Sequence, residues 1–407
     1  MKRYQKQRTE AIEKASVPQM SLDSLVLEGA RRLIQRALEE ELTAVLGREH
    51  YEHHGPTETK HYRNGYGRER KVTIASGTMP LQVPRLREPY ESHIVKRYQR
   101  MSEQMQQLVP QLYLHGLSSG DFRQCFDAVV GPDAPLSESS ILRLKQQWSK
   151  EYDAWRKQHL EQEYLYVWAD GIYPKAGPKN EEMAVLVVVG LNRKGRKEIL
   201  ALEEGYRESA ESWGDVLRSL KRRGVQWIGL VIADGSLGLW SALRDIFPHA
   251  RRQRCFVHKM RNILDKVPAA KQEEVRQALR GLYYAGSLDE ARNLVASFRG
   301  TYGKLYGKAV ASLDEAVGDL FSYMAFPREH WRSIKSTNVI ESMFASVKLR
   351  TDAAKRIASR ESALYLVFKL LKALEQRTRR VIGARLVAET IDSLKSQKRQ
   401  PRLRMVA

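Results

Sequence analysis

The chain has 407 residues and a net charge of +21 at pH 7, with 69 lysines and arginines against 48 acidic residues. A single hydrophobic core rarely serves so many residues, so we expect two or three domains, and the basic excess indicates a polyanionic partner such as a nucleic acid. No run reaches the roughly 18 to 20 uninterrupted apolar residues of a membrane-spanning helix, and no apolar signal-peptide core follows the polar start Met1 to Lys6, so we expect no membrane partner.

Cysteine usage indicates the compartment. The chain contains two cysteines, Cys125 and Cys255, which are too few for a disulfide framework. This agrees with a reducing compartment, and together with the basic charge it predicts a cytoplasmic, DNA-associated protein.

Residues 1–50 are predicted to form an N-terminal helical segment. Apolar side chains recur at helical spacing from Leu22 to Leu46, and Gly47 follows as a plausible helix stop. Residues 51–100 differ, because turn sequences such as Tyr62 to Tyr66 alternate with short runs of strand formers, which predicts a small β-rich segment.

Four histidines in or beside this β-rich segment could act as metal ligands: His50, His53, His54 and His61. No cysteine or acidic residue accompanies them at the spacing of a zinc site. A solvated loop is therefore the favoured interpretation.

Residues 101–158 return to helical patterns. Helices are predicted at Ser102 to His115, Ser119 to Val130 and Ser137 to Tyr152, with glycine and proline at the breaks. Three short helices with tight turns are the outline of a helix-turn-helix DNA-binding domain, in which the third is the recognition helix. Many small helical bundles share this outline, so on its own it leaves DNA binding open.

Two short apolar runs end in the same three residues, Ala-Asp-Gly. The runs are Tyr164 to Gly171 and Ile228 to Gly235. Neither face of the first run is polar, which predicts a central strand with helices on both sides. Each strand would carry an aspartate, Asp170 or Asp234, into the turn at its C-terminal end, where open α/β sheets bind ligands. An aspartate before glycine is also common as a turn former, and that alternative stays open.

The elements after Asp170 complete a sheet. Strands are predicted at Met183 to Gly190 and Lys197 to Leu202, followed by a helix, the strand that ends in Asp234, and a second helix. This order is that of a ribonuclease-H-like core with a mixed sheet, in which the first and fourth strands lie side by side. Asp170 and Asp234 would then be neighbours in space although 234 − 170 = 64 residues separate them.

The ribonuclease-H-like catalytic domain is predicted to comprise residues 159–267 and 333–380. An all-helical insertion rich in Ala, Leu, Glu, Arg and Lys would interrupt it at 268–332. Residues 381–407 are predicted to form a basic C-terminal tail, which lacks regular structure from Ser393 onward. The expected fold class is therefore α/β, with a mostly helical N-terminal DNA-binding region before the core.

Glu341 is the third acidic candidate. It lies off the apolar face of a predicted helix, a face formed by Ile340, Met343, Phe344 and Val347. Asn338 followed three residues later by Glu341 also fits a capping box, so capping and catalysis rank equally on these residues alone.

Three carboxylates on rigid elements suit phosphodiester chemistry. Two hard divalent ions held by oxygen ligands make water nucleophilic and neutralise the charge that builds on a scissile phosphate. Asp170, Asp234 and Glu341 would supply that cage for two Mg²⁺ or Mn²⁺ ions in each active site. The basic remainder of the chain would hold the backbone of double-stranded DNA.

A basic segment surrounds a Cys-x-x-His pair, Cys255 and His258. Two ligands at this spacing make half a zinc site, and no second pair follows, which argues against a closed structural zinc. The favoured interpretation is a buried thiol and a catalytic histidine beside the carboxylates. The cations of this segment, and two that follow Glu341, are predicted to grip DNA phosphates; they are Arg251, Arg252, Arg254, Lys259, Arg261, Lys348 and Arg350.

Several short motifs occur in chain order: Tyr62-Arg63-Asn64-Gly65-Tyr66, Asp170-Gly171-Ile172-Tyr173, Asp234-Gly235-x-x-Gly238-Leu239, Cys255-x-x-His258-x-x-Arg261-Asn262, and Thr337-Asn338-x-x-Glu341 with Arg350-Thr351. With these motifs the chain resembles, over nearly its whole length, the Mutator-type transposases of bacterial insertion sequences. Together the motifs are specific, although any one alone would not be.

The resemblance implies a ribonuclease-H-like domain with an Asp-Asp-Glu triad at Asp170, Asp234 and Glu341. It also implies that the N-terminal region recognises the terminal inverted repeats of an element, and that freed 3′-hydroxyl ends are joined to target DNA. Because one active site must act at each end, we expect a homodimer on DNA. Two alternatives remain: a ribonuclease-H-like nuclease or resolvase that cuts without joining, and a DNA-binding repressor derived from a transposase.

Overall fold

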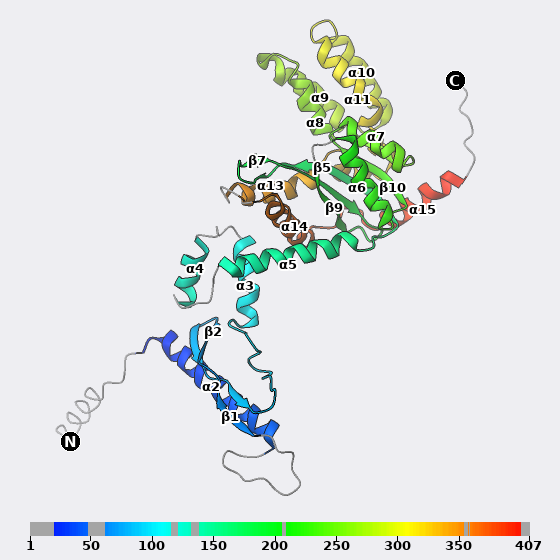
Figure 1. The fold of residues 1–407 in the computed structure, drawn as a ribbon. Helices are drawn as coiled ribbons and strands as arrows, with labels where there is room; N and C mark the ends of the chain where they lie inside the picture. The colour runs from blue at the N-terminus through cyan, green and yellow to red at the C-terminus, as the bar shows by residue number, and fades with distance from the viewer. Residues whose placement is uncertain are drawn as a thin grey trace, which may run out of the picture. The chain divides into compact units, whose positions relative to one another are not determined.

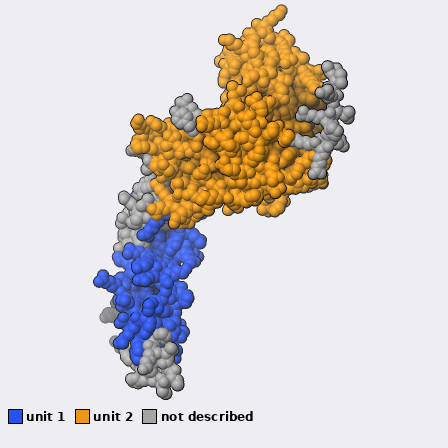
Figure 2. Space-filling view, turned by 45° about the vertical axis from the view of Figure 1, so that its right-hand side comes forward, with its two compact units in different colours: residues 1–144 blue, residues 145–407 orange. Residues whose placement is uncertain are grey.

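The computed structural model describes residues 20–47, 62–114, 121–131, 138–205, 209–353, 357 and 359–399. The chain forms two compact units, residues 1–144 and residues 145–407, coloured blue and orange in Figure 2. The boundary falls inside a continuous helix, α5 (Glu138–Lys157). Each unit has its own cluster of buried apolar side chains, as expected for a chain of this length. The finer division into six segments stays a prediction.

The first unit is built on α2 (Leu22–Leu46), which confirms the predicted helix and its stop. The Ser21 hydroxyl accepts the N–H of Ser24 at the start of α2, and Gly47 ends the helix with a φ of 66°, a conformation that glycine adopts without strain. The apolar stripe of α2 packs on the β-rich segment, and the buried side chains of this core are Leu38, Val72, Met79, Leu81 and Val95.

The β-rich segment contains two antiparallel strand pairs, which confirms the predicted short strands, although the predicted turn sequence Tyr62 to Tyr66 supplies a strand over Arg63–Tyr66. β1 (Arg63–Tyr66) pairs with β4 (Pro84–Leu86), and β2 (Arg70–Ile74) pairs with β3 (Gly77–Leu81). The four histidines considered as metal ligands lie outside the described residues; they are His50, His53, His54 and His61.

Three helices follow, as predicted: α3 (Glu103–Leu114), α4 (Asp121–Val130) and α5. Their role in DNA binding stays a prediction. The third helix runs to Lys157 rather than ending at Tyr152.

The longer α5 results from a buried aromatic stripe. Trp148, Tyr152 and Trp155 occur at positions i, i+4 and i+7, and each is at most 8 % exposed. The ring of Trp155 lies 5.1 Å from the ring of Phe368 on α14 (Arg360–Arg377). This packing continues the helix for a turn beyond the predicted end.

The second unit contains a mixed five-stranded sheet in the order β11-β10-β5-β8-β9 (Figure 1). β10 and β11 run parallel to β5, whereas β8 is antiparallel to β5 and β9 is antiparallel to β8. The strands are β5 (Glu163–Ile172), β8 (Ala184–Leu191), β9 (Lys197–Gly205), β10 (Trp227–Ala233) and β11 (Arg251–Arg254). The first long strand is therefore central and lies beside the strand that precedes Asp234, as predicted.

The edge strand β11 is absent from the sequence-based expectations, because Arg-Arg-Gln-Arg resembles a solvated run of charge. The strand is anchored by Gln253, which is fully buried. Its side-chain amide donates to the carbonyl oxygen of Leu320 at 2.8 Å, and its side-chain oxygen accepts the N–H of Tyr323 at 2.8 Å. A buried amide satisfied by backbone groups thus replaces the usual apolar side chain.

Helices cover both faces of the sheet (Figure 1). On one face, Val167 of β5 shares an apolar core with α6 (Ala210–Arg222) and α7 (Leu237–Ile246). The next residue, Trp168, points to the other face, where its indole N–H donates to the carbonyl oxygen of Ser333 at 3.1 Å. β5 is therefore buried on both sides.

The region predicted as an insertion is helical, as expected, and the chain then returns to the sheet through α13 (Asn338–Ala353), which packs against β5. None of the helices formed by the described residues is long and apolar enough to cross a membrane. The remaining elements are α8 (Phe256–Leu264), α9 (Gln272–Tyr284), α10 (Leu288–Tyr302), α11 (Gly307–Leu320), α12 (Trp331–Ile334), the 3-10 turns η1 (Ala269–Lys271), η2 (Ser322–Ala325) and η3 (Arg328–His330), and the short strands β6 (Lys175–Ala176) and β7 (Glu181–Glu182).

The prediction for the C-terminal tail is wrong in one respect. The sequence predicts no regular structure from Ser393 onward, whereas α15 (Leu386–Arg399) is helical as far as residue 399. Val387 and Ile391 are fully buried, and Lys395 forms an ion pair with Glu163 of β5. The basic composition of this segment made it look unstructured, although it forms an amphipathic helix that packs against the second unit. Residues 400–407 lie outside the described part of the chain.

We expect His330 to make the second unit sensitive to acid. Its ring is buried, with Nδ1 2.7 Å from the Tyr166 hydroxyl and Nε2 3.0 Å from the carbonyl oxygen of Gly383. Burial lowers the pKa of His330 below its ordinary value of about 6.5, so the neutral ring is the stable form. The stability that depends on this neutral ring is complete above about pH 6.5 and is lost as the pH falls, by at most about 1.4 kcal/mol per pH unit.

His330→Gln is therefore expected to flatten the acid side of the stability curve. Urea unfolding of both proteins at about pH 7 and about pH 5 measures the difference in slope. His93→Gln serves as a control, because His93 is exposed in the first unit. Equal slopes for His330→Gln and the wild type would show that the ring titrates normally in the folded protein.

Candidate active site

Two neighbouring parallel strands bring Asp170 and Asp234 to one end of the sheet. In the register of β5 and β10, Trp168 pairs with Ile232, an offset of 232 − 168 = 64 residues. The two aspartates have the same offset, 234 − 170 = 64, so each stands two residues beyond that pair. Both aspartates are half-buried at this end of the sheet.

Local turns fix the direction of the two carboxylates. Oδ1 of Asp170 accepts the N–H of Gly171 at 2.8 Å, and Oδ1 of Asp234 accepts the N–H of Ser236 at 2.9 Å. Gly235 has a φ of +99°, and a Cβ atom there would stand 2.3 Å from Nε of Arg254, so this turn requires glycine. Both aspartate side chains therefore bond to the backbone that follows them, as the turn-forming alternative proposed. The same hydrogen bonds orient the carboxylates, whose oxygen atoms could also bind a cation.

Glu341 lies in the first turn of α13, where its carboxylate accepts the Thr337 hydroxyl and its side chain is 33 % exposed. Among the hydrogen bonds of the described residues, the capping box is not formed, because the Asn338 N–H donates instead to the Ser336 hydroxyl at 3.4 Å. The predicted apolar face is buried, with at most 5 % exposure for Ile340, Met343, Phe344 and Val347. Glu341 lies off this face, as predicted.

Cys255 and His258 lie beside Glu341. Cys255 is fully buried at the start of α8, and His258 follows one turn later. Nε2 of His258 is 3.9 Å from Oε1 of Glu341, and the possible metal-binding atoms of the three residues lie within 4.8 Å of one another. The Thr337 N–H donates to Sγ of Cys255 at 3.3 Å, which ties the start of α13 to the start of α8.

The pKa values of His258 and Cys255 are shifted by their neighbours, and the charge of Asp170 contributes to the shift of His258. A hydrogen bond with Cys255 raises the pKa of His258 to about 9 against the effect of burial, and the negative charges of Cys255, Glu341 and Asp170 act in the same direction. Burial disfavours the Cys255 thiolate, but hydrogen bonds with His258 and Thr337 outweigh burial and lower the pKa of the thiol. His258 and Glu341 thus lie side by side, the charge of Asp170 acts on His258, and the strand register puts Asp234 at the same end of the sheet as Asp170.

The cations predicted to bind phosphates differ in their surroundings: two pair with an acidic side chain of the protein and are largely covered, and most of the others are exposed to solvent. Arg254 and Lys259 both face Glu315, at 2.9 Å and 3.4 Å, and Lys259 is only 2 % exposed. These two side chains are therefore engaged within the protein. The exposed members of the set are Arg251, Arg252, Arg261 and Lys348, and Arg350 is half-buried.

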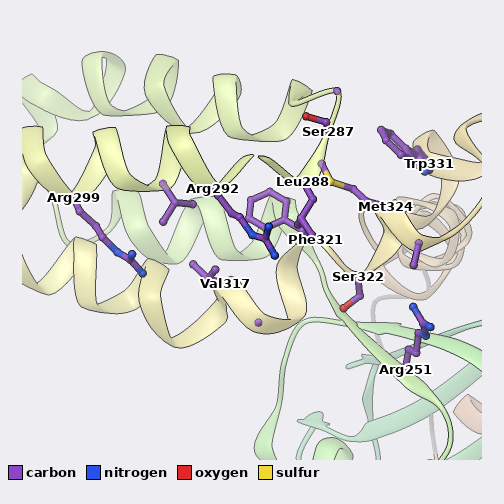
Figure 3. Close-up of a pocket in the computed structure, with 14 residues that line it drawn as sticks. Arg251, Ser287, Leu288, Arg292, Arg299, Val317, Phe321, Ser322, Met324 and Trp331 are labelled. Carbon is purple, nitrogen blue, oxygen red and sulfur yellow. The ribbon is translucent and has the colours of Figure 1, made fainter. Parts of the chain in front are cut away.

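A separate pocket of about 800 Å³ lies among the helices of the insertion (Figure 3). Its largely apolar wall carries three arginines, Arg251, Arg292 and Arg299. Arg251 begins β11 and pairs with Leu230, three residues before the end of β10 at Ala233. Arg251, the one strand residue among the described residues of the pocket wall, is thus three residues before the end of β11 that pairs with Ala233, and the sequence patterns do not indicate this pocket.

Comparison with known proteins identifies relatives over most of the chain. The family described as "Transposase, Mutator family" matches residues 1–380. The transposase for insertion sequence element IS6120 of Mycolicibacterium smegmatis is 41 % identical over 285 residues, which is 70 % of this chain and 88 % of the relative. The transposase for insertion sequence element ISRM5 of Rhizobium meliloti is 31 % identical over 344 residues, 84 % of this chain and 85 % of the relative. The chain belongs to the Mutator family of transposases.

Proposed function

We propose that this transposase is an Asp-Asp-Glu enzyme in which Asp170, Asp234 and Glu341 form the catalytic triad. It cleaves DNA strands by hydrolysis and transfers the freed 3′-hydroxyl ends to target DNA. The observation that carries the proposal is the parallel register of β5 and β10, because it puts two aspartates with matching Ala-Asp-Gly contexts at one end of the sheet.

A ribonuclease-H-like core is part of the proposal. In order of occurrence in the chain, the five strands are arranged 5-4-1-2-3, and the second strand is antiparallel to both of its neighbours. The first and fourth strands are adjacent, as that fold requires. The helix that carries Glu341, α13, follows the helical insertion in the chain and packs against β5, the first strand of the sheet. This supports a catalytic core that is interrupted by the insertion.

The donor chemistry of the proposed triad suits hard divalent cations. Mg²⁺ and Mn²⁺ prefer oxygen ligands, and Asp170, Asp234 and Glu341 would supply them from three rigid elements, β5, the end of β10 and α13. Two such ions, when bound, would make water or a 3′-hydroxyl nucleophilic and neutralise charge on the scissile phosphate. The hydrogen bonds from the N–H groups of Gly171 and Ser236 hold two of the carboxylates in fixed directions.

His258 positions Glu341 and adds positive charge beside the triad. Its imidazole lies 3.9 Å from the Glu341 carboxylate, and the Cys255 thiol holds it there by a hydrogen bond. The raised pKa of His258, about 9, keeps the ring charged at neutral pH. A fixed positive charge at this point favours approach of a DNA phosphate.

DNA is held by the exposed cations of the catalytic unit, which include Arg251, Arg252, Arg261 and Lys348. We assign recognition of the terminal inverted repeats to the N-terminal region with α3, α4 and α5, because three short helices with tight turns fit a helix-turn-helix outline. Two copies would act together, one at each DNA end.

A strand-transfer assay tests this function. Labelled DNA with the ends of the element is incubated with the full chain, a target plasmid and Mg²⁺, and the products are separated by size. We expect both cleaved ends and covalent joints between donor ends and target, and neither product after EDTA removes the divalent ion. Cleaved ends without joints would favour the nuclease, and end binding without any cleaved product would favour the repressor.

A further inference from the structure

We propose that Cys255, His258 and Glu341 form a binding site for a soft divalent cation of the Zn²⁺ class. The site differs from the Mg²⁺ cage in its donor set, although Glu341 belongs to both. Binding of the ion depends on these three donors alone, and only its consequence for DNA cleavage rests on the proposed function.

The donor atoms converge from the starts of two helices. Cys255 and His258 belong to the start of α8, and Glu341 belongs to α13, 341 − 258 = 83 residues later. The donor atoms all lie within 4.8 Å of one another. Bonds of about 2.0 to 2.3 Å to a tetrahedral zinc ion place its ligands roughly 3.3 to 3.8 Å apart. Small side-chain shifts would therefore close the three donors around one ion.

The chemistry of the donors selects the ion. Thiolate and imidazole groups favour Zn²⁺, whereas Mg²⁺ takes oxygen ligands and retains water. The local sequence supplies only the half-site Cys-x-x-His, and the fold adds the third donor. Three protein ligands leave one position open, as in zinc sites that bind a fourth ligand from solvent or substrate. This is compatible with the absence of a second Cys or His pair at zinc-finger spacing in the sequence.

The cluster is anchored on one side and accessible on the other. Cys255 is fully buried, and the Thr337 N–H and hydroxyl lie 3.3 Å and 3.2 Å from its sulfur. The side chains of His258 and Glu341 are 24 % and 33 % exposed, which gives an ion a route from solvent. On binding, the thiol and the imidazolium each release one proton to solvent, and the two groups coordinate as a thiolate and a neutral imidazole.

Occupancy of this site would have a consequence for catalysis. An ion bound to Cys255, His258 and Glu341 takes the glutamate away from the Mg²⁺ cage, which then keeps two of its three carboxylates. Zn²⁺ is therefore expected to inhibit strand cleavage in the presence of Mg²⁺.

Cobalt titration tests the site itself. Co²⁺ substitutes for Zn²⁺ and, when bound to a thiolate, gives an intense charge-transfer band in the near ultraviolet. The full chain, purified free of metal, should bind one Co²⁺ with this band, and added Zn²⁺ should displace it. Cys125→Ser is the matched control, because the chain has two cysteines, and this variant should keep the band.

Cys255→Ser should lose the band, and both Cys255→Ser and His258→Gln should bind Co²⁺ more than about 100-fold more weakly, since even groups outside the first coordination shell contribute about 10- to 100-fold. Circular dichroism checks that each variant is folded, and His258→Gln keeps the test valid if the cysteine variant is not. A band that persists in Cys255→Ser, or unchanged affinity in a folded His258→Gln, would overturn the proposal.

Asp170→Asn separates this inference from the proposed function. Asp170 is not one of the three donors, so the variant should keep the Co²⁺ band while it loses DNA cleavage. A lost band with cleavage retained would contradict both assignments, whereas a wild-type chain without the band would contradict only the zinc site.

Discussion

Replacing any one of the three carboxylates by its neutral isostere is expected to stop DNA cleavage and joining. Asp170→Asn, Asp234→Asn and Glu341→Gln keep the size of the side chain but remove one charge from the proposed cation cage. Loss of several kcal/mol of transition-state stabilisation corresponds to a rate decrease of roughly 1,000-fold or more. Binding of DNA ends should change little, because the exposed cations that hold the backbone are untouched.

The measurement pairs single-turnover cleavage in Mg²⁺ with a gel-shift titration of the same DNA. Asp215→Asn is the matched control, because Asp215 is a surface carboxylate on α6 that is 72 % exposed and pairs with Arg218. This control should cleave at the wild-type rate. If one of the three triad variants did so too, that residue would have to be removed from the triad.

Trp168→Ala is expected to destabilise the second unit by about 3 to 5 kcal/mol. The indole is fully buried two residues before Asp170, and its removal leaves a cavity that a packed sheet fills only in part. Its N–H also donates to the carbonyl oxygen of Ser333 at 3.1 Å, in the segment that leads into α13. Because this bond joins the strand of Asp170 to α12, which directly precedes the helix of Glu341, cleavage activity should fall together with stability.

Trp168→Phe separates the two contributions, since it keeps most of the buried ring but loses the N–H donor. We expect it to cost about 1 to 3 kcal/mol, because the Ser333 carbonyl is left without that donor. Urea unfolding followed by circular dichroism measures both variants, with Tyr284→Ala as a control at a side chain that is 74 % exposed. Wild-type stability in Trp168→Ala would contradict the packing described for the central strand.

The two apolar runs that end in Ala-Asp-Gly reveal most of the core from sequence. A strand buried on both faces needs apolar side chains at successive positions, and this pattern places β5 and β10 within one or two residues of their observed bounds. The parallel pairing of these strands then follows from chain order, which is why Asp170 and Asp234 could be expected at one end. The role of Glu341 could not be decided from the sequence alone, because a capping residue and a metal ligand can have the same local sequence.

Features that depend on contacts between residues far apart in the chain could not be predicted from sequence patterns. β11 is polar and is anchored because Gln253 bonds the backbone of Leu320, 320 − 253 = 67 residues later. The bond between Thr337 and Cys255 likewise joins two helix starts that lie far apart in the chain. Burial of Lys259 against Glu315 could not be anticipated from a count of positive charges. Each of these arises from packing between the sheet and the helices inserted between its strands and α13.

Iron-directed cleavage of the polypeptide tests the convergence of the three carboxylates most directly. Fe²⁺ occupies Mg²⁺ sites and, with ascorbate and peroxide, cuts the backbone next to the bound ion. If Asp170, Asp234 and Glu341 hold the same cations, fragments should end near all three positions, and Mg²⁺ should suppress them together. Fragments near one carboxylate alone, or sets that respond to Mg²⁺ independently, would contradict a shared site.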